Sequence, residues 1–223
     1  MTGFQTCALP IFNVEPTGFK HTGVFPEQAV NWDLMSGMIA ANTSAGRETR
    51  VLNLFAYTGA ATIACALAGA TEVVHVDASK GMNEKAKQNA LISGSTDKYI
   101  RFITEDVNKF VDRELRRQRR YDAVIMDPPS YGRGPGGELW KLENELYKMV
   151  DKCCGLLSDD PLFFILNSYT SGYAPSVLTN ILDLTVSSKF GGKASADELG
   201  LKASSRSIVL PCGSSGRWMS RRV

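Results

Sequence analysis

The chain has 223 residues, of which 43% are hydrophobic and 22% charged, a composition that supports one globular domain around a buried core. Its formal net charge of +2 neither requires nor excludes a polyanionic partner, so such a partner must be argued from local clusters of side chains. The five cysteines form no CxxC pair and the two histidines lie far apart, which disfavours a zinc site or a disulfide framework and favours a reducing, cytoplasmic location. All apolar runs are far shorter than the roughly 20 residues of a membrane span, so no transmembrane helix is expected.

The start of the chain is unusual. Residues 1–11 have neither the basic n-region nor the long apolar h-region of a signal peptide. Residues 5–11 back-translate into a sequence resembling a sequencing-adapter tail, so we interpret 1–11 as a non-native start and expect the natural protein to begin earlier. We divide the rest into a strand, loop and helix extension at 12–48, a main domain at 49–218 and a tail at 219–223.

From residue 50 onwards, short β-rich runs alternate with helical patterns. Strands are predicted at 50–55, 72–77, 99–104, 121–127 and 161–167, with helices at 59–70, 83–93, 107–118, 143–157 and 174–188. This alternation predicts a doubly wound parallel sheet, and continuous apolar runs fit strands that are covered on both faces. Two last strand candidates, near 189–195 and 206–210, have no helical pattern between them, which predicts a hairpin at the sheet edge. The expected fold is therefore α/β: a Rossmann-like, seven-stranded sheet, mostly parallel with one antiparallel edge strand.

Residues that follow the strands are the candidates for a site, because ligands of such sheets bind outside the carboxyl ends of the strands. After the first strand, Gly59 in NLFAYTGAAT allows a tight turn, and the helix start favours an anion. The G-x-G-x-x-G pattern of a dinucleotide site is absent, and a plain strand-to-helix turn is the alternative. After the second strand, Asp77 can accept hydrogen bonds from ribose hydroxyls or act as a helix N-cap.

The third and fourth strands end in further acids. Glu105 and Asp106 can accept the exocyclic amine of an adenine or can cap the next helix. The fourth strand ends in IMDPPSYGRGPGG, where Asp127 is an acceptor, two prolines fix the backbone and Tyr131 offers an aromatic face. A rigid acceptor beside a ring suits a planar heterocycle held against an electrophile, whereas a Pro-Pro turn after a core strand is the alternative.

Four segments carry a resemblance to a known family: VLNLFAYTGA, HVDASKGM, EDVNKF and IMDPPSYGRGPGG. Their order and spacing resemble the motifs of class I S-adenosylmethionine-dependent methyltransferases. HTGVFPEQ and GRGPGGELWK narrow the resemblance to the bacterial family that methylates cytosine C5 or guanine N7 of 23S ribosomal RNA. The resemblance runs from about Phe12 to Trp218. It implies a methyltransferase domain at 49–218, S-adenosyl-L-methionine as the cofactor and RNA, specifically ribosomal RNA, as the substrate.

The resemblance also implies roles for individual residues. Its catalytic corner, facing the methyl group and the target base, comprises Asp127, Pro128, Pro129 and Tyr131. Its cofactor-binding residues are Gln28, Phe55, Tyr57, Thr58, Gly59, Ala60, Asp77, Ala78, Glu105, Asp106 and Val107. Among these, the turn at 55–60 would line the methionine moiety, Asp77 would hold the ribose and Asp106 the adenine amine. Gln28 lies in GVFPEQ, where the family more often reads FLDQR, and it faces cofactor or substrate.

No cysteine stands where a covalent mechanism needs one. Relatives that methylate cytosine C5 attack C6 with a thiolate placed after the fifth strand, and here that strand is followed by ILNSYTSG. Cys153 and Cys154 fall within a predicted helix as buried filler, and Cys212 is the one cysteine at a late-strand loop. We therefore expect no cysteine nucleophile and no metal, with direct in-line transfer to a nitrogen or oxygen and Asp127 available to accept one proton.

Basic and aromatic residues give weaker indications about the substrate. Residues 112–122 contain five arginines that could bind phosphates, but they precede the fourth strand at the amino edge of the sheet, which favours a solvated helix face. Three cations are better placed near the catalytic edge: Arg133, Lys141 and Arg217. The glycine loop at 132–137 is a candidate lid, with Tyr131 and Trp140 as candidate stacking partners, although Trp140 also fits helix packing. RNA methylation is favoured; the alternatives are methylation of a protein amide or small molecule, and a non-catalytic nucleotide-binding domain.

Overall fold

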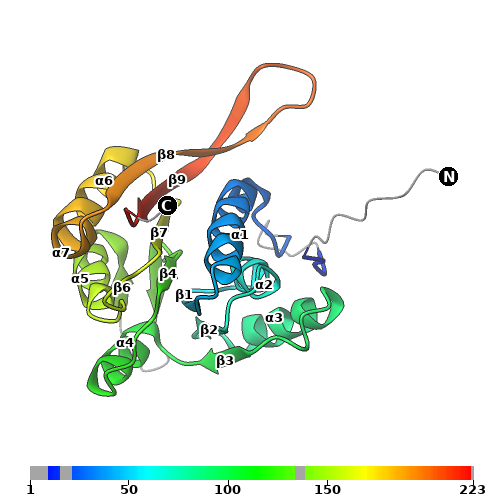
Figure 1. Cartoon of the computed structure of the whole chain (residues 1–223). Helices are drawn as coiled ribbons and strands as arrows, with labels where there is room; N and C mark the ends of the chain where they lie inside the picture. The colour runs from blue at the N-terminus through cyan, green and yellow to red at the C-terminus, as the bar shows by residue number, and fades with distance from the viewer. Residues whose placement is uncertain (1–9, 16–21, 134–138, 222–223) are drawn as a thin grey trace.

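Seven strands form one sheet, in the order β3-β2-β1-β4-β7-β9-β8. The structure is a computed structural model that describes residues 10–15, 22–133 and 139–221. The strands are β1 (Arg50–Leu54), β2 (Glu72–Asp77), β3 (Ile100–Thr104), β4 (Ala123–Met126), β7 (Phe163–Ser168), β8 (Lys193–Lys202) and β9 (Val209–Met219). All neighbours are parallel except at β9, which is antiparallel to both β7 and β8 (Figure 1). The expected sheet, mostly parallel with one reversed strand in a hairpin at its edge, is confirmed.

Helices cover both faces of this sheet. The helical elements are η1 (Pro26–Gln28), α1 (Ala29–Ser44), α2 (Ala60–Leu67), α3 (Lys80–Ile92), α4 (Val107–Arg116), α5 (Leu142–Cys154), α6 (Pro175–Leu182), η2 (Asp183–Ser187) and α7 (Ser188–Phe190). Successive residues of β1 pack in different hydrophobic clusters. Val51 lies in the cluster that includes residues of α1 and α2, and Leu52 lies in the cluster that includes residues of α4 and α5. Burial on both faces explains the continuous apolar runs of the strands. No helix in the described ranges is long and apolar enough to cross a membrane.

Three details differ from the expectations. Residues 10–15 lie in no strand, because side chains at the end of α3 bind their backbone. The amide of Ile11 donates to Oγ of Ser93, the C-cap of α3 (2.8 Å), and the amide of Asn13 donates to Asn89 Oδ1 (2.9 Å). The glycine loop begins and ends in a short hairpin, β5 (Tyr131–Arg133) and β6 (Leu139–Lys141), while 134–138 and the side chain of Arg133 lie outside the described residues. Finally, β8 and β9 are longer than expected, because pairing along the hairpin overrides the low strand propensity of their glycines, serines and proline.

The arginine-rich run at 112–122 lies directly before β4, at the amino edge as expected. Its side chains largely bind buried acids. Arg119 Nη2 lies 3.0 Å from Glu72 Oε2, and Arg117 Nη1 lies 3.6 Å from Glu114 Oε1. Glu114 also accepts a hydrogen bond from the Tyr121 hydroxyl at 2.7 Å. These arginines, just after the last turn of α4, therefore balance the charges of buried carboxylates. Such pairing supports the helix-face interpretation over a phosphate site.

Candidate active site

A cavity of about 750 Å³ opens at the carboxyl edge of the sheet, within the size range of small-molecule sites. Since β3, β2, β1 and β4 are parallel neighbours, the residues that follow them are brought side by side. Most of the predicted site residues line this cavity: Phe55, Tyr57, Asp77, Ala78, Asp106, Val107, Asp127, Pro128 and Pro129. Carboxylates from the ends of three strands thus face one space.

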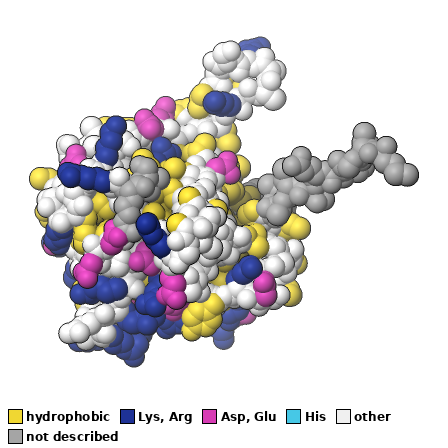
Figure 2. All heavy atoms as spheres, viewed as in Figure 1, with side chains coloured by type: hydrophobic (Ala, Val, Ile, Leu, Met, Phe, Trp, Pro, Cys, Tyr) yellow, Lys and Arg dark blue, Asp and Glu magenta, His cyan; other side chains and the backbone are white. Residues whose placement is uncertain are grey.

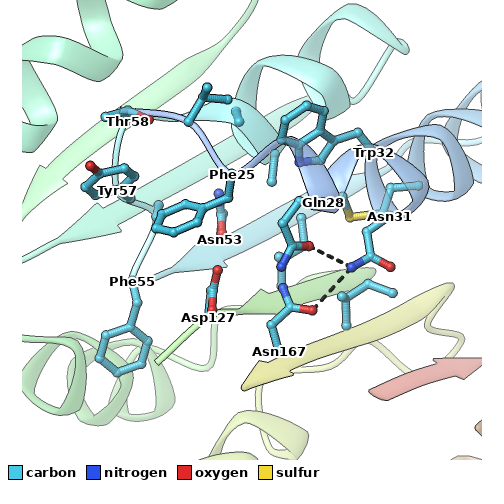
Figure 3. Close-up of a pocket in the computed structure, with 17 residues that line it drawn as sticks. Phe25, Gln28, Asn31, Trp32, Asn53, Phe55, Tyr57, Thr58, Asp127 and Asn167 are labelled. Atoms are coloured by element: carbon cyan, nitrogen blue, oxygen red, sulfur yellow. Dashed lines mark hydrogen bonds between the residues drawn. The ribbon is translucent and has the colours of Figure 1, made fainter. Parts of the chain in front are cut away.

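A second, smaller cavity of about 50 Å³ lies between the start of α1 and the same sheet edge (Figure 3). It brings in three further predicted residues, Gln28, Thr58 and Ala60. Four residues border both cavities: Phe25, Phe55, Tyr57 and Asp127. The two cavities therefore adjoin, with Asp127 at the junction.

Three predicted residues border neither cavity, as far as the described residues define them. Gly59 adopts a left-handed φ of +89° at the start of α2, and a Cβ there would lie only 3.1 Å from Ala86 Cβ, so the glycine serves the turn and its packing. Glu105 forms an ion pair with Arg113. Tyr131 lies on β5 with 54% of its surface exposed.

The turn after β1 is held in an unusual conformation. Phe55 and Tyr57 have φ values of +55° and +50°, which non-glycine residues adopt at a cost of about 1–3 kcal/mol and often at functional sites. Asp77 fixes this turn, because its Oδ2 accepts the amide of Tyr57 at 2.9 Å while Oδ1 accepts the amide of Ser79 at 2.8 Å. Ser79, and not Asp77, is the N-cap of α3. Each carboxylate oxygen of Asp77 has a second lone pair with which to accept a ligand hydroxyl.

Asp106 caps a helix and also lies at the large cavity. Its Oδ1 accepts the amide of Lys109 at 3.0 Å, which makes it the N-cap of α4, and the residue also lines the large cavity. The capping bond holds the carboxylate in place and leaves it lone pairs for a ligand. Val107 and Ala78 add apolar surface beside it.

Asp127 is half-buried, and no hydrogen bond to its carboxylate is formed by the side chains that the structure describes. Burial and then the nearby Glu27 raise the pKa of the carboxyl from 3.8 to about 7. The corner around it is rigid: Trp140 Nε1 donates to the Pro129 carbonyl at 2.7 Å, and the hydroxyls of Ser130 and Thr170 lie 2.6 Å apart. A carboxyl with this pKa, and without a hydrogen-bond partner in the described part of the chain, is suited to accepting a hydrogen bond or a proton near neutral pH.

The raised pKa of Asp127 predicts a pH-dependent stability. Between about pH 4 and pH 7 the folded protein keeps a proton that the unfolded chain has lost, so this group's contribution to stability falls as the pH rises through that window. Asp127→Asn removes the buried charge, and we expect it to raise the melting temperature relative to wild type at pH 8 but not at pH 5. Thermal unfolding at both pH values measures this, and an equal difference at the two would contradict the assigned pKa.

Two aromatic residues at this edge were not predicted. Phe25 borders both cavities, and its ring centroid lies 5.6 Å from that of Tyr57 and 5.4 Å from that of Tyr169. Tyr169 follows the end of β7 and lines the large cavity, and burial and then the neighbouring Asp127 raise the pKa of its phenol. Reading the residue after the fifth strand as a ligand position, as for the other four strands, would have found Tyr169. Trp140, a predicted stacking candidate, also lines this cavity, and its ring centroid lies 5.3 Å from that of Phe55.

A buried amide network anchors the N-terminal wall of the site. Asn31 Nδ2 donates to Gln28 Oε1 (2.7 Å) and to Asn167 Oδ1 (3.2 Å), as Figure 3 shows. Gln28 Nε2 in turn donates to the Tyr169 hydroxyl at 2.9 Å. On the other side, Arg217 Nε donates to Asn31 Oδ1 at 2.7 Å. The network joins η1 and α1 to β7 and β9.

None of the described cysteines lines either cavity. Cys153 and Cys154 are buried in α5, as expected, and burial raises the pKa of both thiols. Cys212 lies half-buried on β9, where its Sγ donates to the Leu210 carbonyl at 3.4 Å. Burial and then Glu27 raise the pKa of this thiol as well, so it is poorly suited to form a thiolate.

Comparison with known proteins defines the class. The crystal structure of the SAM dependent methyltransferase from Agrobacterium tumefaciens superposes with a TM-score of 0.87 and 37% identity, over 94% of this chain and 67% of that one. A family model described as S-adenosylmethionine-dependent methyltransferase matches residues 21–161. The chain therefore belongs to this family of S-adenosylmethionine-dependent methyltransferases, as the resemblance implied.

Curated relatives carry more specific names. The ribosomal RNA large subunit methyltransferase K of Neisseria meningitidis serogroup B is 30% identical over 130 residues, which are 58% of this chain and 36% of that protein. The ribosomal RNA large subunit methyltransferase K/L of Shewanella sp. (strain MR-4) is 33% identical over 121 residues, 54% of this chain and 16% of that protein. The matches cover well under half of the length of these curated relatives.

Proposed function

We propose that the protein methylates a base of ribosomal RNA, a cytoplasmic substrate, by direct transfer to a nitrogen or oxygen without a cysteine nucleophile. The observation that carries this proposal is the carboxyl of Asp127, which has no described hydrogen-bond partner and stands at the junction of two cavities beside the rings of Phe25 and Tyr169. A flat base fits between aromatic walls and an acceptor. The names of the curated relatives support RNA as the substrate class.

The residues of the site fit S-adenosyl-L-methionine. Asp77 has lone pairs for the ribose hydroxyls, Asp106 and Val107 are placed for an adenine, and the strained turn at 55–60 borders the small cavity, where the methionine end would lie. When bound, the cofactor supplies an electrophilic methyl group on its sulfonium. The protein's own residues hold the cofactor, orient the methyl group toward the nucleophile and shield both from water.

Asp127 and its neighbours would orient the nucleophile. The Asp127 carboxylate accepts a hydrogen bond from the target base and takes its proton if one must leave, which a pKa near 7 permits. Pro128 and Pro129 keep this acceptor fixed, and the Trp140 bond to the Pro129 carbonyl holds the corner against the short β5–β6 hairpin. Phe25 and Tyr169 exclude water from one side of the site. Most of the rate acceleration comes from aligning the nucleophile with the methyl group.

Cys212→Ser tests the absence of a thiol nucleophile. We expect this variant to keep both its methyl-transfer rate and its affinity for S-adenosylhomocysteine, because Cys212 lies on β9 and borders neither cavity among the described residues. Single-turnover transfer and calorimetric titration measure the two quantities. Loss of transfer with unchanged cofactor affinity would instead assign a covalent role to this cysteine.

The function itself is tested by transfer of labelled methyl groups from S-adenosylmethionine into total bacterial RNA that lacks the modification. Nucleoside mass spectrometry of the product identifies the methylated base and atom. A methylated ribosomal base supports the proposal. Intact binding of S-adenosylhomocysteine without incorporation into RNA would overturn it and direct attention to protein or small-molecule substrates.

A further inference from the structure

The terminal hairpin continues beyond the sheet as an arm. Ser168, the last residue of β7, pairs with Ser214 of β9, which itself pairs with Glu198 of β8. Residues 199–213, here called the arm, therefore extend past the carboxyl end of β7, and Figure 1 shows this hairpin leaving the body of the protein. The carboxyl end is the edge that carries both cavities, so the arm projects on the catalytic side.

The charged residues of the arm are all basic. It contains Lys202 and Arg206 and no acidic residue, and both cations are exposed. No ion pair to either is formed within the described ranges. Figure 2 shows the arm standing clear of the body and carrying basic side chains. Between and beside the cations lie three exposed serines, whose hydroxyls can also bind phosphate: Ser204, Ser205 and Ser207.

The root of the arm touches the proposed base-binding wall. Gly213 crosses so close to the end of β7 that a Cβ there would lie 2.7 Å from the Ser168 carbonyl and 2.9 Å from Cδ1 of Tyr169. Only glycine lets the two segments approach this far. A polymer that lies along the arm would therefore pass beside Tyr169 and the large cavity.

We propose that the arm binds the phosphate backbone of the RNA strand that flanks the target base. This inference rests on the proposed function, since it names how that substrate is held. Charge complementarity favours RNA, because the arm presents two exposed cations and contains no acidic residue, which matches a polyanion. The exposed apolar residues Ile208, Val209 and Leu210 could instead pair with a second copy, but two such arms would bring cations of the same sign together.

The test is the double variant Lys202→Ala/Arg206→Ala, with Arg47→Ala/Arg116→Ala as a matched control. Both control arginines are exposed, lie at the amino edge of the sheet and form no ion pair within the described ranges. Binding of unmodified 23S ribosomal RNA, transcribed in vitro, is measured at several salt concentrations. We expect the arm variant alone to bind more weakly and to lose about 1.4–2 from the slope of log affinity against log salt, since each lost phosphate contact removes about 0.7–1. Both variants should bind S-adenosylhomocysteine as the wild type does.

The outcomes separate this inference from the proposed function. An arm variant that binds RNA with wild-type affinity and salt slope overturns the arm's role, even if the wild type methylates RNA. Arm-dependent RNA binding without any methylation supports the arm and overturns the proposed function. If Ile208→Ser/Leu210→Ser turns a dimer into a monomer in sedimentation velocity while the cation variant binds RNA normally, the arm is a self-association surface and the proposal is wrong.

Discussion

Asp127→Asn is expected to lower kcat for methyl transfer by about 10²–10⁴-fold, the range that a positioned proton acceptor contributes, while the affinity for S-adenosylhomocysteine stays near wild type. Asparagine preserves the shape of the side chain but cannot take a proton. Because the pKa of Asp127 is about 7 and the carboxylate is the active form, the wild-type rate should rise with pH up to about 7 and then level off. Fixed-time methyl-transfer assays of wild type and variant from pH 5 to 9 measure both the fall in kcat and the pH dependence.

The control for this prediction is Asp159→Asn, which changes an exposed acid that precedes β7 at the opposite edge of the sheet and should leave the rate unchanged. Calorimetric titration with S-adenosylhomocysteine shows whether the cofactor site of Asp127→Asn is intact. A variant that transfers methyl groups at the wild-type rate, with an unchanged pH profile, would remove Asp127 from the mechanism.

Asp77→Ala is expected to have the opposite effect, raising the dissociation constant of S-adenosylhomocysteine by about 10–150-fold. That range corresponds to the about 1.5–3 kcal/mol that hydrogen bonds to a charged group contribute. The substitution also releases the amide of Tyr57, so the strained turn after β1 loses its anchor. Isothermal titration calorimetry measures the affinity directly.

Ser79→Ala is the matched control for Asp77. It removes the side-chain cap of α3, the 3.3 Å bond from the amide of Met82, and leaves the Asp77 carboxylate in place. Its expected cost is a modest loss of stability, about 0.5–2 kcal/mol, with little change in cofactor affinity. If both variants weakened binding equally, the ribose-holding role of Asp77 would give way to a general effect of disturbing the start of α3.

Much of the fold could be predicted because its signals are local. Strands buried on both faces read as short apolar runs, and their alternation with helical patterns allows few topologies. The hairpin of β8 and β9 was placed correctly but with the wrong bounds, since cross-strand pairing rather than composition stabilises it. The sequence predicts a short strand at the beginning of the 12–48 extension, but Asn89 of α3 and Ser93, the C-cap of α3, bind the backbone there although they are distant in sequence.

The site was predictable where it follows strand ends and not where it depends on tertiary contact. The rule that ligands lie at the carboxyl edge led to Asp77, Asp106 and Asp127. It could not indicate that Glu105, next to Asp106, forms an ion pair with Arg113 on the helix that follows, α4. Nor could it show that Tyr131 is carried outwards by a short hairpin while another tyrosine, at the end of β7, faces the cavity.

The amide network around Asn31 has a consequence for where the enzyme can be divided. The sequence suggests a boundary between residues 48 and 49, between the extension and the main domain. In the folded protein, this boundary would separate α1 from the sheet that it packs against. A fragment that began at residue 49 would expose the apolar face that Met35 and Ile39 cover and leave Asn167 and Arg217 without their partner. It would also lose Phe25 and Gln28, one wall of each cavity. The first helix is thus an indivisible part of the catalytic body, and truncations should start upstream of it.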